Sequence, residues 1–276
     1  MKYGLDVSIT RDYASVSKLA ELAALAEAAG WDGFFVQDCL LASKPVALVD
    51  PWLALGAIAL ASRRLRIGAL MTPLAAYRPW QVARQCVSLD HLSAGRLIFG
   101  AGLGFQADDF LTVGDDPSAS VRAEKLDESL ALLRLFWQGE PFTFEGKRYQ
   151  MRQARLLPAP VQKPSIPIWV AGAWPHHKPL RRAAGYDGLY IASERATGEP
   201  LTPDDLREAL AYVQSQRQAA SPFDVVFAGE TEAAGAAETI QPYAEAGATW
   251  WLEGIWTERG TIQQMEQRIR QGPPSA

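Results

Sequence analysis

Short apolar runs alternate with longer amphipathic stretches along nearly the whole chain. The short runs are rich in β-branched and aromatic residues, whereas the longer stretches repeat their apolar residues at helical spacing. This alternation predicts parallel strands joined by crossover helices. The predicted strands are 3–7, 33–37, 64–71, 96–100, 168–171, 188–192, 224–228 and 249–252. The predicted helices are 17–29, 52–61, 79–92, 122–138, 177–184, 203–218, 234–246 and 258–270.

Residues that start and stop helices support these boundaries. Asp50 and Pro51 have the pattern of an N-cap and a first-turn proline, and Gly30 follows the end of the first predicted helix. A repeating strand–helix unit of this kind predicts an α/β fold, a (β/α)8 TIM barrel with its active site at the carboxyl ends of the strands. We expect a single barrel domain over residues 1–270, with residues 271–276 as a frayed tail.

Two segments depart from the strand–helix repeat. Residues 106–121 form a polar, acidic insertion after the fourth strand, which we expect to cover the active site as a lid. Residues 142–151, with Glu145 and Gly146 at a turn, predict a small hairpin before the fifth strand.

Composition narrows the class of protein. The chain has 276 residues, close to the roughly 250 of one barrel. A formal net charge of -4 provides no basic field for a nucleic acid, so we expect no nucleic-acid partner. The longest apolar stretch, residues 51–61, is too short to cross a bilayer, and no signal-peptide pattern opens the chain. We therefore expect a cytoplasmic protein without membrane contact.

Several kinds of catalytic barrel do not fit the residues present. The two cysteines, Cys39 and Cys86, lack a CxxC spacing, and the three histidines are too few for a multi-histidine metal centre. No lysine lies convincingly at a strand end, as a Schiff-base enzyme requires. We expect no metal site.

Five segments in barrel order resemble the luciferase-like monooxygenase superfamily of flavin- or deazaflavin-dependent oxidoreductases. The longest, LDHLSAGRLIFGAGLG, runs from the third helix through the fourth strand. The five segments are residues 28–35, 66–73, 89–104, 157–162 and 167–172. The resemblance therefore spans the whole barrel and implies a cofactor at the carboxyl ends of the strands.

The resemblance assigns the cofactor phosphate to the end of the fifth strand. Gly172, Ala173 and Trp174 lie between a strand and a helix, where backbone N–H groups are available to an anion. The alternative is that Gly172 only permits a tight turn. For the flavin ring we expect Thr72 as the preferred contact, and relatives sometimes carry a non-proline cis peptide at the position of Leu70–Met71. The remaining expected ring contacts are Asp6, Met71, Leu103 and Gly104.

The end of the second strand departs from the superfamily pattern. Many relatives place a histidine after the acidic residue there, whereas this chain has Asp38 followed by Cys39. We take Asp38 and Cys39 as the candidate catalytic residues, although a thiol shuttles protons at neutral pH only if its pKa is lowered. A capping or loop role for Asp38 is the alternative.

The substrate pocket is expected to be apolar and walled by aromatic side chains. Its candidate residues are Phe105, Asp108, His176 and Trp251. For Asp108 the alternative is a solvated lid residue, and for His176 a solvated first turn of a helix.

These residues and the resemblance predict an oxidoreductase acting on a small, largely apolar organic substrate. We favour FMN and monooxygenation, with a separate flavin reductase as a possible partner. The alternative cofactor is the 8-hydroxy-5-deazaflavin coenzyme, which supports hydride transfer only. Two further hypotheses are a non-catalytic flavin-binding protein and an unrelated barrel lyase or hydrolase. The resemblance also implies a homodimer.

Overall fold

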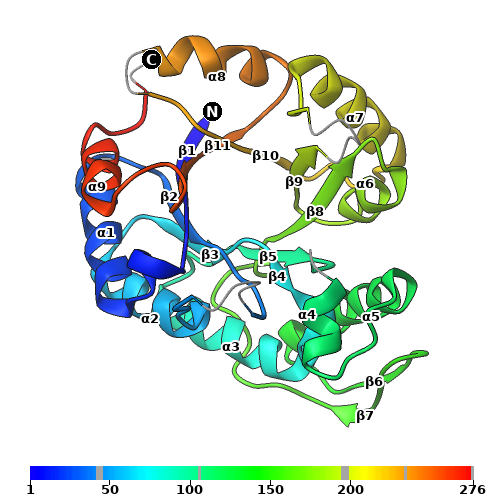
Figure 1. Cartoon of the computed structure of the whole chain (residues 1–276). Coiled ribbons are helices and arrows are strands. Elements are labelled where there is room, and N and C mark those ends of the chain that lie inside the picture. The colour runs from blue at the N-terminus through cyan, green and yellow to red at the C-terminus, as the bar shows by residue number, and fades with distance from the viewer. Residues whose placement is uncertain (42–45, 105–106, 194–198, 233–234, 275–276) are drawn as a thin grey trace.

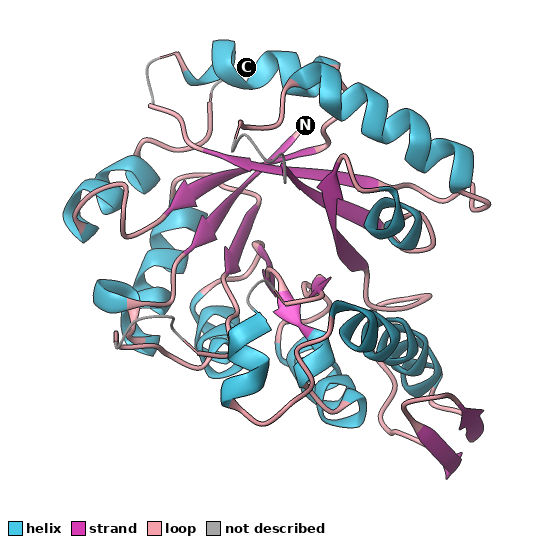
Figure 2. Ribbon diagram, turned by 45° about the vertical axis from the view of Figure 1, so that its right-hand side comes forward, coloured by secondary structure: helices cyan, strands magenta, loops and turns pink. Residues whose placement is uncertain are grey.

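The computed structural model describes residues 1–41, 46–104, 107–193, 199–232 and 235–274. Within these ranges a parallel sheet curls into a barrel that is surrounded by helices (Figures 1 and 2). Its strand order is β3-β2-β1-β11-β10-β9-β8-β5-β4. The ends of this order meet because Ile67 accepts a hydrogen bond from Ile98 and donates one to Arg96. The predicted barrel is therefore confirmed.

The barrel strands fall close to the predicted ranges. They are β1 (Lys2–Val7), β2 (Gly33–Val36), β3 (Arg66–Ala69), β4 (Thr72–Pro73), β5 (Phe99–Gly102), β8 (Ile168–Trp174), β9 (Gly188–Ser193), β10 (Asp224–Gly229) and β11 (Trp250–Ile255). The predicted hairpin is also present, as antiparallel β6 (Phe142–Glu145) and β7 (Gln150–Ala154), and it projects from the barrel in Figure 1.

The helices alternate with the strands as the periodicity predicts. They are α1 (Val16–Ala28), α2 (Pro51–Ala61), α3 (Pro79–Leu92), α4 (Ala107–Thr112), α5 (Ala119–Gln138), α6 (His177–Ala183), α7 (Pro203–Gln216), α8 (Ala236–Glu245) and α9 (Ile262–Arg270). Helix α4 lies in the predicted insertion.

The largest differences from the predicted boundaries have local causes. Helix α9 begins at Ile262, later than predicted, because Thr261 is its N-cap and forms a capping box with Gln264. Strand β5 begins at Phe99 because the preceding Leu97 makes only an isolated bridge to Ile67.

Side chains on the strands pack into two separate layers. Phe35, Trp169 and Trp250 fill the inside of the barrel, where their ring centroids lie 5.2–5.8 Å apart. Trp251 belongs instead to the layer between the strands and the helices, against Phe227. Successive residues of a strand point to opposite faces, so the two neighbouring tryptophans separate into different layers.

No helix in the described ranges is long and apolar enough to cross a membrane.

Candidate active site

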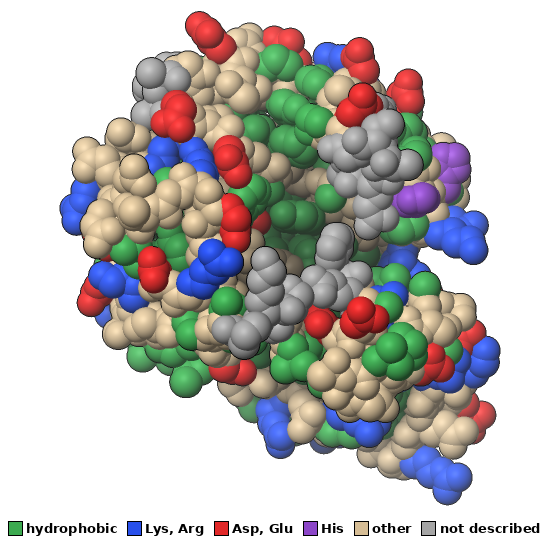
Figure 3. Space-filling model, viewed as in Figure 1, with side chains coloured by type: hydrophobic (Ala, Val, Ile, Leu, Met, Phe, Trp, Pro, Cys, Tyr) green, Lys and Arg blue, Asp and Glu red, His purple; other side chains and the backbone are tan. Residues whose placement is uncertain are grey.

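A cavity of about 840 Å³ opens at the carboxyl ends of the strands, where Figure 3 shows a hollow lined largely by hydrophobic side chains. A volume of this size suits a ligand as large as a cofactor. Its apolar lining includes Leu40, Val46, Met71, Leu103, Phe110 and Leu126. The cavity is therefore at the position where barrel enzymes place their chemistry.

Asp38 lines this cavity directly after β2. Its Oδ1 accepts a hydrogen bond from the Tyr77 hydroxyl at 3.2 Å, and its Oδ2 is buried without a hydrogen-bond partner among the residues described. Burial raises the pKa of Asp38 to about 7, and Asp50 adds to the rise, whereas the hydroxyls of Thr72 and Tyr77 oppose it. Asp38 therefore changes its protonation state near neutral pH.

Cys39 also lines the cavity, but its chemistry differs from the predicted catalytic role. Burial, and then the charges of Asp38 and Asp109, raise the pKa of the Cys39 thiol to about 11. The thiol stays protonated at neutral pH, so the lowered pKa that a proton-shuttling Cys39 would require is not present.

Asp6 lies below the cavity rather than on its surface. This β1 side chain is buried, and the hydroxyl of Tyr190, a residue of β9 that lines the cavity, donates to its Oδ2 at 3.4 Å. Burial raises the pKa of Asp6 to about 7, opposed by Trp256 and Tyr190. Asp6 thus reaches a ligand only through Tyr190, and the predicted direct contact with the flavin ring is not available in this arrangement.

The predicted ring contacts separate into two groups. Met71, Leu103 and Gly104 line the cavity, and the Leu70–Met71 peptide bond is cis. Leu70 packs inside the barrel, and Thr72, the preferred contact, is fully buried and lies beside Asp38. The structure therefore gives Met71, not Thr72, to the cavity surface.

Gly104 allows helix α4 to approach the end of β5. Its φ of +90° lies in the left-handed region, and a Cβ there would be 2.6 Å from the Phe110 ring. Arg122 reinforces this approach, because its guanidinium donates to the Gly104 carbonyl at 2.7 Å and lies over the Phe110 ring. The insertion is thereby held against the cavity.

The predicted phosphate segment is only partly at the cavity. Gly172 and Ala173 line it, whereas the Trp174 indole N–H donates to Asp205 at 3.2 Å. A Cβ on Gly172 would lie 2.4 Å from the side chain of Leu189, on the outer face of the strand. Gly172 lies within β8, so the tight turn that we considered as its alternative role is not present; its lack of a side chain instead permits close packing on the outer face, while its backbone lines the cavity.

The predicted substrate residues are not brought together. Phe105 lies outside the described residues. Asp108 and His176 are exposed and do not line the cavity, whereas the neighbouring Asp109 does. Trp251 is buried on the outer face of β11, so the expectation of an aromatic wall containing it is wrong.

Sequence reasoning missed several residues that line or support the cavity. Tyr190 has the inward position of an alternating strand, a signal that the sequence offered. Tyr77 follows a short 3-10 helix outside every predicted element and gave no such signal. The missed cations are Arg11, Arg122 and Arg182. Arg182 is paired with Asp127.

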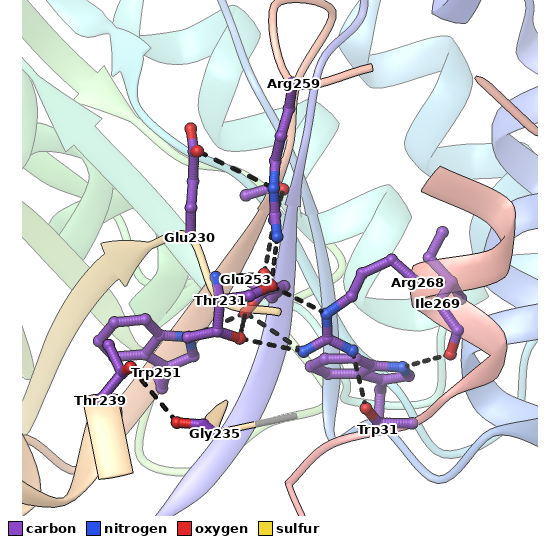
Figure 4. Close-up of polar contacts among 12 residues, drawn as sticks. Trp31, Glu230, Thr231, Gly235, Thr239, Trp251, Glu253, Arg259, Arg268 and Ile269 are labelled. Atoms are coloured by element: carbon purple, nitrogen blue, oxygen red, sulfur yellow. Dashed lines mark hydrogen bonds and ion pairs between the residues drawn. The ribbon is translucent and has the colours of Figure 1, made fainter. Parts of the chain in front are cut away.

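A second buried polar cluster lies outside the barrel wall, between β11 and α9 (Figure 4). We call it the Glu253 cluster, comprising Thr231, Trp251, Glu253, Arg259 and Arg268. Glu253 is fully buried; Arg259 donates to its Oε1 at 2.5 Å, and Arg268 Nη2 lies 3.4 Å from its Oε2. Thr231 donates its N–H and its hydroxyl to the carboxylate at 2.8 and 2.7 Å, and the Trp251 indole donates at 3.2 Å. Both carboxylate oxygens are therefore paired.

Among the residues that the structure describes, no group of three or more His, Cys, Asp or Glu side chains is placed to hold a metal ion.

The fold and the cavity define the class of protein. The luciferase-like monooxygenase family matches residues 3–272, so the chain belongs to this family, as its motifs predict.

Curated relatives give a finer comparison. The F420-dependent glucose-6-phosphate dehydrogenase of Microbacterium testaceum (strain StLB037) is 32% identical over 180 residues, which cover 62% of this chain and 52% of the relative. Its counterpart in Nakamurella multipartita is 31% identical over 203 residues, covering 70% and 57%. The chain thus spans little more than half the length of these relatives.

Solved structures share the barrel. An F420-dependent secondary alcohol dehydrogenase in complex with an F420-acetone adduct has a TM-score of 0.77 at 18% identity, and the match covers 92% of both chains. The monooxygenase RslO1 from Streptomyces bottropensis has a TM-score of 0.76 at 19% identity, covering 98% of this chain and 97% of the other. At these identities the likeness establishes the fold.

Proposed function

We propose that this chain is an oxidoreductase that uses the deazaflavin F420 to transfer hydride to or from a small, largely apolar organic substrate. The observation that carries this proposal is the large apolar cavity at the carboxyl ends of a luciferase-like barrel. The relatives named as F420-dependent dehydrogenases support the deazaflavin. They give no support to FMN, which we favoured from the sequence alone.

The cavity fits a flat ring with an anionic chain. Gly102, Gly104, Gly172 and Ala173 carry little or no side-chain bulk, so a planar ring has close access to their backbone. Met71 provides an apolar surface, and Arg11, an exposed cation of the cavity lining, matches an anionic tail. These groups would hold the cofactor, which supplies a two-electron hydride exchange when bound.

Equilibrium titration with F420 and with FMN, followed by cofactor fluorescence, tests this proposal. We expect saturable one-to-one binding of F420 and at least about tenfold weaker binding of FMN, a difference of about 1.4 kcal/mol. A cavity variant, Ala173→Leu, should weaken F420 binding because its longer side chain enters the space beside Gly172. Ala211→Leu is the matched control, since Ala211 is exposed on α7.

Each competing hypothesis predicts a different outcome of the same titration. Binding of FMN without F420 would support a monooxygenase. Binding of F420 without oxidation or reduction across a panel of alcohols would support a carrier protein. If neither compound binds, an unrelated barrel activity replaces the proposal.

A further inference from the structure

We propose that Asp38 is the catalytic residue that exchanges a proton with the substrate, in place of the histidine that this chain lacks. The proposal rests on the proposed hydride transfer and adds to it the proton-exchanging residue and a substrate class, an alcohol or its carbonyl product. Three observations on Asp38 and its surroundings carry it.

The first observation is position. Asp38 lies at the carboxyl end of β2 and lines the same cavity as Met71, Gly102 and Gly172. A substrate that shares this cavity with the cofactor therefore lies against Asp38. Asp6, the other carboxyl buried at this end of the barrel, is separated from the cavity by Tyr190 and does not have this access.

The second observation is how the carboxyl is held. Tyr77 donates to Oδ1 at 3.2 Å, and burial together with Asp38 raises the pKa of Tyr77 far above its ordinary value. Tyr77 consequently remains a donor at every working pH and fixes one oxygen of Asp38. The other oxygen is buried and has no partner among the residues described, which leaves it available to hold a proton.

The third observation is the set of charges around Asp38. Asp50, at the N-terminus of α2, raises its pKa, and Asp109 of α4 acts on the adjacent thiol of Cys39. Tyr77 and Cys39 are neutral in this range, since the pKa of each is raised. With its pKa raised to about 7, Asp38 populates both the acid and the base form near neutral pH, as a general acid–base group requires.

The step balances with Asp38 as the proton acceptor and the deazaflavin of the proposed function as the hydride acceptor. In oxidation, the C–H bond of the alcohol carbon would break and its hydride would pass to the oxidised deazaflavin. The O–H bond of the same group breaks, its proton passes to the Asp38 carboxylate, and a C=O bond forms. In reduction, neutral Asp38 would return the proton to the carbonyl oxygen, and the reduced deazaflavin would supply the hydride to the carbonyl carbon.

The apolar walls of the cavity indicate what kind of carbon skeleton the alcohol has. Leu40, Leu103, Phe110 and Leu126 line the same cavity as Asp38, so the carbon chain of the alcohol would pack against hydrophobic side chains. A hydroxyl group is the polar part that Asp38 requires.

A titration independent of the cofactor tests the proton-exchanging state of Asp38. The protein is labelled with [4-13C]aspartate, and the Asp38 signal is identified by its loss in Asp38→Asn. We expect a midpoint near pH 7, and Tyr77→Phe should move it upward because the tyrosine hydrogen bond lowers the pKa. A midpoint near the ordinary value of 4 would overturn the proposal.

Binding and turnover of Asp38→Asn then separate the substrate from the cofactor. We expect the variant to bind F420 within about threefold of the parent protein, while the single-turnover reduction of F420 by isopropanol and a panel of longer secondary alcohols falls at least about 100-fold. The rise of the parent rate with pH through about 7 should also disappear. Asp38→Glu, which keeps the carboxyl, should recover part of the rate.

The remaining outcomes decide between the two proposals. If the parent protein does not bind F420, the proposed function fails, whatever the midpoint of Asp38. If F420 binds but no alcohol in the panel reduces it, or if Asp38→Asn turns over at the parent rate, the inference about Asp38 fails and the proposed cofactor stands. Loss of F420 binding in Asp38→Asn would make Asp38 a cofactor contact and would also overturn the inference.

Discussion

Two groups of buried carboxyls in this protein have opposite surroundings. In the Glu253 cluster, the carboxylate is paired with two arginines, a threonine and an indole N–H. At the carboxyl ends of the strands, Asp38 on the cavity surface and Asp6 beneath it each meet a tyrosine hydroxyl and keep one oxygen unpaired among the residues described. The charge of the buried carboxylate is thus balanced by hydrogen bonds and ion pairs between β11 and α9. At the carboxyl ends of the strands, the buried carboxyls have fewer such partners.

The difference shows which buried polar groups maintain the fold. Burying a charge is costly unless it is paired. Removing one partner of a buried ion pair therefore destabilises the folded protein strongly. An unpaired carboxyl instead holds its proton to a higher pH, as the raised pKa values of Asp6 and Asp38 indicate. Asp6 and Asp38 therefore reduce the stability of the folded protein at neutral pH.

The largest expected effect comes from breaking the Glu253 cluster. Glu253→Gln keeps the shape of the side chain but removes the buried carboxylate that pairs with Arg259 and Arg268, and Arg259 retains only the more distant Glu230, at 3.9 Å, among the residues described. We expect a loss of about 3–5 kcal/mol in the free energy of unfolding, measured by urea denaturation. Asp38→Asn, the matched change at the cavity, should cost nothing or increase stability at pH 8. Equal losses in the two variants would remove the distinction between the clusters.

The pH dependence of stability provides the next test. The pKa values of Asp6 and Asp38 are raised from 3.8 to about 7 in the folded protein. Between pH 4 and 7 the folded state therefore binds more protons than the unfolded state, so each carboxyl lowers stability as pH rises, by at most about 1.4 kcal/mol per pH unit. The decline stops above the folded pKa.

Asp38→Asn isolates the part of this decline that Asp38 causes. Unfolding free energies at pH 5, 6, 7 and 8 should fall less steeply in the variant, by about 2–3 kcal/mol over the whole interval. Curves that stay parallel from pH 5 to 7 would show that Asp38 ionises as an ordinary carboxyl.

Two buried threonines give a smaller and closely matched comparison. The Thr231 hydroxyl donates to Glu253, whereas the buried Thr72 hydroxyl lies beside Asp38, close enough to lower the pKa of that carboxyl, but completes no hydrogen bond within the described residues. Thr231→Val should therefore cost about 1–3 kcal/mol, and Thr72→Val about zero or a small gain. Thermal and urea unfolding of both variants measure the difference, and a larger loss in Thr72→Val would show that its hydroxyl has a partner in solution.

The sequence predicted the barrel because alternation and helical spacing are properties of neighbouring residues. It also placed Asp38, Met71, Gly104 and Gly172 at strand ends, since in a barrel every strand ends on the same rim. It misplaced Trp251, because a shift of one residue in a strand moves a side chain to the other face.

What the sequence could not supply depends on residues that are distant along the chain. The neutrality of Cys39 follows from burial and from charges on other elements. The pairing of Tyr77 with Asp38 joins two loops, and that of Tyr190 with Asp6 joins opposite parts of the barrel. No local pattern in the chain encodes these contacts.

The central claim is that the cavity bordered by Asp38 is the cofactor site, and a crystal structure of the protein saturated with F420 tests it most directly. We predict density for the deazaflavin ring inside this cavity, against Met71 and the backbone of Gly102–Gly104 and Gly172–Ala173. F420 bound elsewhere on the molecule, with the cavity filled only by solvent, would contradict the account.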